Sequence, residues 1–138
     1  MKTIGLILGL VFSSLVATAQ DNKGVTITVV IENVLSDEGI IMGALHTEQT
    51  FMKGPGVVNQ QVDAAKGEVT LTFENVEKGS FALMLLHDVN NNQRMDFEAN
   101  GMPKENYATS GETTFGPPSF AGAQFNVVDE DLEFKIRF

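Results

Sequence analysis

The 138-residue sequence contains no cysteine, no tryptophan, a single tyrosine and only two histidines. The missing cysteines exclude disulfide bonds, thiol catalysis and thiolate-bound metals. Basic residues are also scarce, because 9 lysines and arginines stand against 18 aspartates and glutamates, a formal net charge of -9. Such a protein repels the phosphates of nucleic acids and anionic lipid headgroups. We therefore expect no nucleic-acid partner, and we expect cations, divalent metals above all, to be favoured instead.

The N-terminal residues 1–19 have the pattern of a secretory signal peptide. Lys2 gives a short positive start, residues 4–16 are almost wholly apolar, and Ala17 and Ala19 are small residues at the positions that a signal peptidase reads. The apolar run is shorter than the roughly 20 residues of a membrane-spanning helix. We expect cleavage after Ala19 and export to the periplasm, the cell surface or the medium, without membrane insertion; an uncleaved anchor is the alternative.

Period-two patterns predict strands along residues 20–138, which we expect to form a single domain. In the first of them, Val25, Ile27, Val29 and Ile31 fall on one face and more polar residues on the other. Residues 47–53 predict one helical turn capped by Thr47. Strands are predicted over residues 25–32, 40–46, 57–64, 68–76, 81–86, 121–128 and 132–138.

The segment 81–86, FALMLL, has no alternation and predicts a central strand that is buried on both faces. About seven short strands separated by turns are typical of a sandwich. The expected fold class is all-β, an antiparallel β-sandwich.

A polar segment with the spacing of a calcium loop follows the predicted central strand. Side-chain oxygens of Asp88, Asn90, Asn92 and Asp96 take places one, three, five and nine, and the carbonyl of Arg94 takes place seven. Calcium needs about six to eight oxygen ligands, which alternate residues of a tightly wound loop can direct inward. Oxygen ligands without sulfur or paired histidines favour calcium over zinc or copper.

Two places depart from the pattern of a strong calcium loop. Place six, normally glycine, is Gln93, and place twelve, normally a bidentate glutamate, is Ala99. Glu98 or Glu105 would have to supply the missing carboxylate, so we expect weak binding, with a dissociation constant of about 10⁻⁴ to 10⁻³ M. The alternative is an asparagine-rich turn whose side chains bond their own backbone and hold no ion.

No catalytic apparatus is visible, and no catalytic residue is assigned. Neither histidine stands in a Ser-His-Asp order or in an HExxH helix. A lone histidine at the end of a core strand is more often a hydrogen-bonded boundary residue than a catalyst. The alternative is a hydrolase-type enzyme that uses His87, Asp88, Lys104 and Glu105 under the flap formed by residues 102–120.

Four ordered segments make the chain similar to a known family: LHDVNNNQRMD at 86–96, GMPKENY at 101–107, GPPSF at 116–120 and AQF at 123–125. On these segments the chain, from residue 25 to residue 138, resembles the domain of unknown function 2141 family of uncharacterised exported bacterial proteins. The resemblance implies an immunoglobulin- or transthyretin-like β-sandwich, and it carries no activity with it. It also implies glycines at two loop positions that Asn91 and Gln93 occupy here.

The resemblance further implies that residues 102–120 pack as one long ordered flap. The residues themselves agree with this expectation. Gly116-Pro117-Pro118 favours an extended backbone, and Tyr107, Phe115 and Phe120 supply apolar anchors that a disordered linker rarely contains.

Together these patterns predict an exported binding or structural module with a weak calcium-binding loop and an unknown protein or a surface glycan as its partner. A carrier of a small apolar ligand is a further alternative, and it would need an interior cavity of about 300 Å³ or more. The expected cofactor is calcium, and its expected ligands are Asp88, Asn90, Asn92, Arg94, Asp96 and Glu98.

Overall fold

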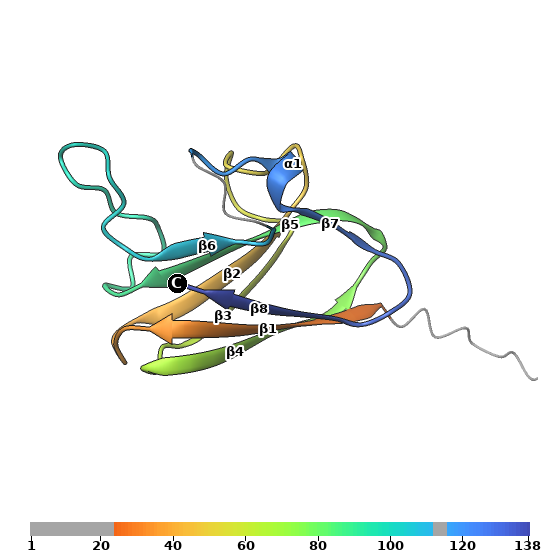
Figure 1. The fold of residues 1–138 in the computed structure, drawn as a ribbon, viewed down its shortest axis with the longest axis horizontal. Helices are drawn as coiled ribbons and strands as arrows, with labels where there is room; N and C mark the ends of the chain where they lie inside the picture. The colour runs from red at the N-terminus through yellow and green to blue at the C-terminus, as the bar shows by residue number, and fades with distance from the viewer. Residues whose placement is uncertain (1–23, 112–115) are drawn as a thin grey trace, which may run out of the picture.

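The computed structural model describes residues 24–111 and 116–138. The expected signal peptide and Phe115 lie outside the described residues. The described chain folds into two β-sheets stacked face to face, with two loops and a short helix above one of the sheets (Figure 1). Among the described residues, no helix is long and apolar enough to cross a membrane.

The lower layer in Figure 1 is a three-stranded sheet with the order β4-β1-β8. β1 (Val25–Val34) runs antiparallel to β4 (Gly67–Val76) and parallel to β8 (Leu132–Arg137). The parallel pair departs from the expected all-antiparallel pattern. It arises because the chain crosses from the other sheet after residue 127 and meets the free edge of β1 in the same direction.

The upper layer is a five-stranded sheet with the order β3-β2-β5-β6, in which β7 also pairs with β5. All of its pairs are antiparallel. The segments 40–46, 57–64 and 81–86 are confirmed as strands, whereas β6 was not predicted. Its strands are β2 (Ile40–His46), β3 (Val58–Asp63), β5 (Gly79–Asp88), β6 (Tyr107–Thr109) and β7 (Gln124–Val127).

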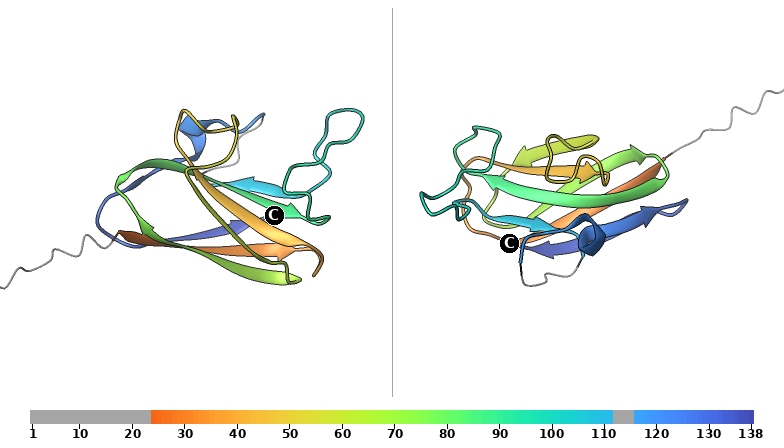
Figure 2. Two further views of the ribbon diagram at one scale, coloured as in Figure 1. Left: turned by 180° about the vertical axis from the view of Figure 1, so that it is seen from behind. Right: turned by 90° about the horizontal axis from the view of Figure 1, so that it is seen from above.

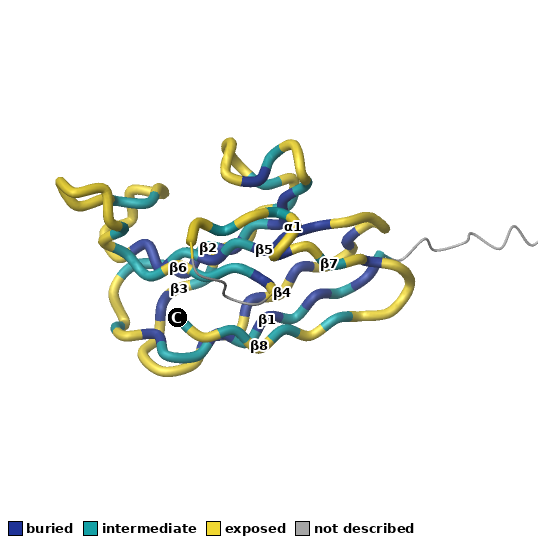
Figure 3. The backbone as a smooth tube through the Cα atoms, turned by 45° about the horizontal axis from the view of Figure 1, so that its top comes forward, coloured by how far each residue is buried: buried dark blue, intermediate teal, exposed yellow. Residues whose placement is uncertain are grey.

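The core fills the space between the two sheets (Figure 3). The alternation in β1 is confirmed, because the predicted inward residues are buried and their neighbours are half-buried. Gly43 of β2 faces this core, where a Cβ atom would collide with the side chain of Leu71. Glycine at this position therefore lets the sheets approach closely. The fully buried large side chains include Ile27, Ile31, Ile41, Leu45, Leu71, Phe73, Leu83 and Leu85.

β5 is the central strand, and its predicted burial is confirmed on the inner face and in part on the outer face, where Ala82 is buried but Met84 and Leu86 are half-buried. Phe81, Leu83 and Leu85 face the main core, while Ala82 belongs to a second buried cluster on the outer face of the sheet. α1 (Phe120–Ala123) covers this second cluster, and the side chain of Ser119 caps its first turn. The strand expected over residues 121–128 therefore begins only at residue 124, because one helical turn precedes it.

Ser110 bridges a gap in the pairing of β5. β7 pairs with residues 79–82 and β6 with residues 84–86, so Leu83 falls between them. The Leu83 N–H donates to Ser110 Oγ at 2.9 Å, and the Ser110 N–H donates to the Leu83 carbonyl at 3.0 Å. The Ser110 hydroxyl in turn donates to the carbonyl of Ala123 at 2.6 Å. This buried serine thus ties α1 to the central strand.

Replacing Ser110 with alanine should lower the free energy of unfolding by about 1–3 kcal/mol, because two buried backbone groups lose a partner. Urea denaturation followed by circular dichroism measures the loss without relying on tryptophan fluorescence. Ser80→Ala is the matched control, because the Ser80 hydroxyl bonds only the exposed side chain of Asn126; its effect should stay within about 0.5 kcal/mol. Equal losses in both variants would contradict the bridging role.

Candidate functional site

The predicted ion-binding loop begins at Asp88, whose side chain is fully buried. Its Oδ1 accepts from the N–H of Asn92 at 3.2 Å, and its Oδ2 accepts from the N–H of Gln93 at 2.7 Å. These bonds wind the loop back over its first residue. Asn91 and Gln93 consequently adopt left-handed backbone conformations, with φ of 56° and 61°. The sharp turn that calcium loops make at place six is therefore present at Gln93.

Asp96 lies opposite the turn and collects the two asparagine side chains. Asn90 donates to Asp96 Oδ2 at 2.7 Å, and Asn92 donates to Oδ1 at 2.8 Å and to Oδ2 at 2.9 Å. The hydrogen bonds from Asn90 and Asn92, followed by the charges of Arg94 and Lys104, hold the pKa of the Asp96 carboxyl below its ordinary value. Asp96 is thus kept as an anion.

Glu105 joins the two ends of the loop. Its Oε1 accepts from the N–H of Val89 and its Oε2 from the N–H of Asp96, both at 3.2 Å. Glu98 lies farther out, in a hairpin where its N–H donates to the carbonyl of Met102 at 2.7 Å. Of the two glutamates considered as a source of the missing carboxylate, Glu105 is therefore the one that contacts the loop.

Of the predicted ligands, Asn90, Asn92 and Asp96 bring their side chains into contact, while the Asp88 carboxylate bonds the backbone of the same turn. Half of this set are neutral amides, and within the described residues no group of three or more His, Cys, Asp or Glu side chains is placed to hold a metal ion. Calcium binding at the predicted ligands therefore stays a prediction. What the structure adds is a loop with its polar groups satisfied by internal hydrogen bonds.

His87 points away from this loop, as its neighbour relation to Asp88 in a strand requires. Its ring is buried between the sheets, where Nε2 lies 2.8 Å from the carbonyl of Glu38 and the ring stacks on Phe138 at 6.4 Å between centroids. These partners are those of a structural histidine. The enzyme alternative needs His87, Lys104 and Glu105 to converge on one cavity. The contacts of the His87 ring within the described chain include neither Lys104 nor Glu105.

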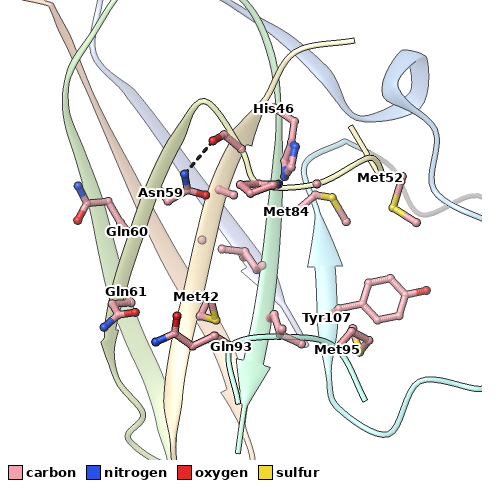
Figure 4. A pocket seen from close by; sticks show the side chains of 17 residues that line it. Met42, His46, Met52, Asn59, Gln60, Gln61, Met84, Gln93, Met95 and Tyr107 are labelled. Atoms are coloured by element: carbon pink, nitrogen blue, oxygen red, sulfur yellow. Dashed lines mark hydrogen bonds between the residues drawn. The ribbon is translucent and has the colours of Figure 1, made fainter. Parts of the chain in front are cut away.

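An open groove of about 740 Å³ crosses the outer face of the five-stranded sheet (Figure 4). Met42 and Met84 form its floor, the 47–57 loop closes one side, and Gln93 and Met95 bring the predicted ion-binding loop to the other. No residue lining it is charged. The groove was not predicted from the sequence, because a methionine in an apolar strand is usually taken for a core residue.

His46 lies at the end of the groove that is nearest the second cluster. The ring is buried, packs edge-on against Phe51 with centroids 6.0 Å apart, and places Nδ1 at 3.1 Å from the carbonyl of Thr50. A carbonyl only accepts, so Nδ1 carries the proton and Nε2 keeps its lone pair in the neutral ring. Burial lowers the pKa of His46, although its bond to Thr50 acts in the opposite direction.

One protein-family model matches residues 29–135. The chain belongs to the DUF2141 family. Its members are described as uncharacterised proteins conserved in bacteria. The resemblance inferred from the four segments is thus confirmed. No curated protein and no solved structure matches the chain.

The DUF2141 match contains both features of this outer surface. The loop from Asp88 to Glu105 lies inside residues 29–135, and so does every residue that lines the groove. The loop and the groove are therefore parts of one family domain. Gln93 and Met95 belong to both, so a displacement of either residue changes the lining of the groove.

Replacing Asp88 with alanine should lower the free energy of unfolding by about 1–3 kcal/mol, because two backbone N–H groups lose their acceptor. Gln93→Gly tests the same turn with the opposite expectation. It removes a left-handed residue that costs about 1–2 kcal/mol, a gain larger than the roughly 0.5–1 kcal/mol entropy cost of glycine. Urea denaturation of both variants measures the difference. A loss in Gln93→Gly as large as that in Asp88→Ala would contradict this account.

The buried neutral His46 should make the fold less stable in mild acid. Because its folded-state pKa lies below the ordinary value of 6.5, the unfolded chain takes up a proton first, and stability falls as the pH drops through 6.5. In a His46→Asn variant this part of the pH dependence should vanish. A titration of the imidazole followed by nuclear magnetic resonance checks the cause, and a midpoint at or above 6.5 would contradict it.

Proposed function

We propose that the protein is an exported binding module in which calcium binds the folded loop of residues 88–98 and thereby fixes the shape of the groove beside it. The observation that carries this proposal is the double role of the loop. Asn90, Asn92 and Asp96 gather oxygen-bearing side chains in the turn that the Asp88 carboxylate holds, while Gln93 in the same turn lines the groove.

The chemistry of the loop supports a hard cation. Asn90 and Asn92 direct their amide nitrogens at the Asp96 carboxylate. Turning each amide about its last torsion exchanges nitrogen for oxygen, because the two atoms are related by a half-turn. Amide oxygens, carboxylates and the carbonyl of Arg94 would then surround one point, which is the donor set that calcium takes.

The backbone of the loop is already folded for this purpose. Gln93 has the positive φ that place six requires, and Glu105 holds both ends of the loop through backbone N–H groups. An ion would not have to order the chain from a random state, so little conformational entropy opposes binding. The left-handed, non-glycine Gln93 and the absence of a glutamate at residue 99 keep the expected affinity low.

The export part of the proposal rests on residues 1–19, which have the features of a signal peptide. Calcium is available at millimolar levels to extracellular modules whose dissociation constants are about 10⁻⁴ to 10⁻³ M. A partner protein or surface glycan would then meet a groove whose wall is held by the ion. The uncharged lining of the groove supports a neutral or apolar contact surface.

Calcium titrated into chelator-treated protein should give heat in an isothermal titration. At 10 mM calcium, with the affinity expected above, it should stabilise the fold by about 1.4–2.7 kcal/mol. Asp96→Asn should remove most of this effect, since it removes the only carboxylate that faces both asparagines. Asp129→Asn, an exposed acidic residue in the turn before β8, is the control and should bind calcium normally. Absence of heat and of any stabilisation in the unmodified protein would refute calcium binding.

A further inference from the structure

Methionine sulfur is concentrated in the groove. The chain has six methionines, and four of them line this one surface: Met42, Met52, Met84 and Met95. The lining also holds His46 and no carboxylate, ammonium or guanidinium group. The protein has no cysteine and a net charge of -9, so methionine sulfur and imidazole nitrogen are its soft donor atoms. In the groove these atoms lie apart from the oxygen donors of the loop.

The strand register explains how the methionines and the histidine meet. Across β2 and β5, Ala44 pairs with Met84, while His46 pairs with Ala82. Met84 is therefore the diagonal neighbour of His46, at a distance that long side chains span. The two small alanines leave room around them. Figure 4 shows Met84 just below the imidazole and Met52 farther out on the neighbouring loop.

The imidazole of His46 is oriented so that the lone pair of Nε2 can bind a metal ion. Nδ1 is fixed by the carbonyl of Thr50 at 3.1 Å, an arrangement that metal-binding histidines use to orient the ring. All hydrogen bonds of this ring within the described chain use Nδ1. Because no buried side-chain nitrogen or oxygen of the described residues lacks a partner, the unbonded Nε2 keeps some solvent exposure, and His46 itself lines the groove.

We propose that the groove binds a soft monovalent cation of the copper(I) class through Nε2 of His46 and the thioether sulfurs of Met84 and Met52. Thioether ligands select copper(I), whereas hard divalent cations prefer carboxylate oxygens, and no carboxylate lines the groove. The negative field of the whole protein attracts the cation, and the uncharged groove accepts it without a competing lysine or arginine. Met42 and Met95 offer further sulfur along the floor and the wall. This site is separate from the proposed calcium loop.

Copper(I), added without oxygen to the purified protein in the presence of the chromophoric chelator bicinchoninate, tests the proposal. The protein should withdraw one equivalent of copper from the chelator. His46→Asn and Met84→Leu should each lower the affinity at least about tenfold, since even outer-shell changes cost about 10–100-fold. Met102→Leu is the matched control, because Met102 is exposed on the hairpin outside the groove, and its affinity should equal that of the unmodified protein.

Silver(I), which cannot change oxidation state under these conditions, identifies the ligands. The methyl resonances of Met84 and Met52 should shift in nuclear magnetic resonance spectra, while that of Met102 should not. Asp96→Asn separates the two metal proposals, because it should abolish calcium binding and leave copper(I) binding unchanged. Failure to withdraw copper from the chelator, or equal affinities in Met84→Leu and Met102→Leu proteins that melt normally, would overturn the proposal. If a small apolar molecule shifted these methyl resonances and silver(I) did not, the groove would belong to that ligand class and the proposal would be overturned.

Discussion

The position of β5 is the constraint on which the rest of the structure depends. This strand is hydrogen-bonded along both edges, and apolar residues alternate onto both of its faces. The second sheet covers the inner face. On the outer face, the 47–57 loop and α1 cover the end near Ala82, and the predicted ion-binding loop folds over the end at Asp88. The groove is the stretch between these covers, above Met84 and Leu86. Figure 2 shows the two covers standing apart over the same sheet.

Asp88 shows how strongly this constraint acts on a polar residue. A carboxylate without solvent contact is costly unless hydrogen bonds compensate for its lost hydration. Two backbone N–H groups supply that compensation, but only if the chain turns back at once after the strand. The turn forces Asn91 and Gln93 into left-handed conformations, and it brings the polar side chains of residues 90–96 together. The loop's donor set is thus a consequence of burying the end of β5.

The strands were predictable where period two extends over several residues, as in β1 and β8, or where an apolar run is bounded by turns, as in β5. β6 was not, because three residues are too few to show a period, and its place depends on a hydroxyl from Ser110. Local spacing likewise brought Asp88 and Asp96 into one candidate site. The groove escaped prediction because it joins residues from distant strands, and only the β2–β5 register places them together.

The two proposed sites use opposite kinds of donor atom, and the structure keeps these atoms apart. Carboxylates lie in the loop and are absent from the groove lining, sulfur and imidazole nitrogen lie in the groove, and Gln93 and Met95 connect the two. If an ion in the loop fixes the position of Met95, it changes the free energy of whatever the groove binds. Linkage then requires that a ligand in the groove change the affinity of the loop for its ion by the same factor. Because Glu105 bonds both ends of the loop, such coupling would pass through the segment between Val89 and Asp96, which carries Gln93 and Met95 into the groove.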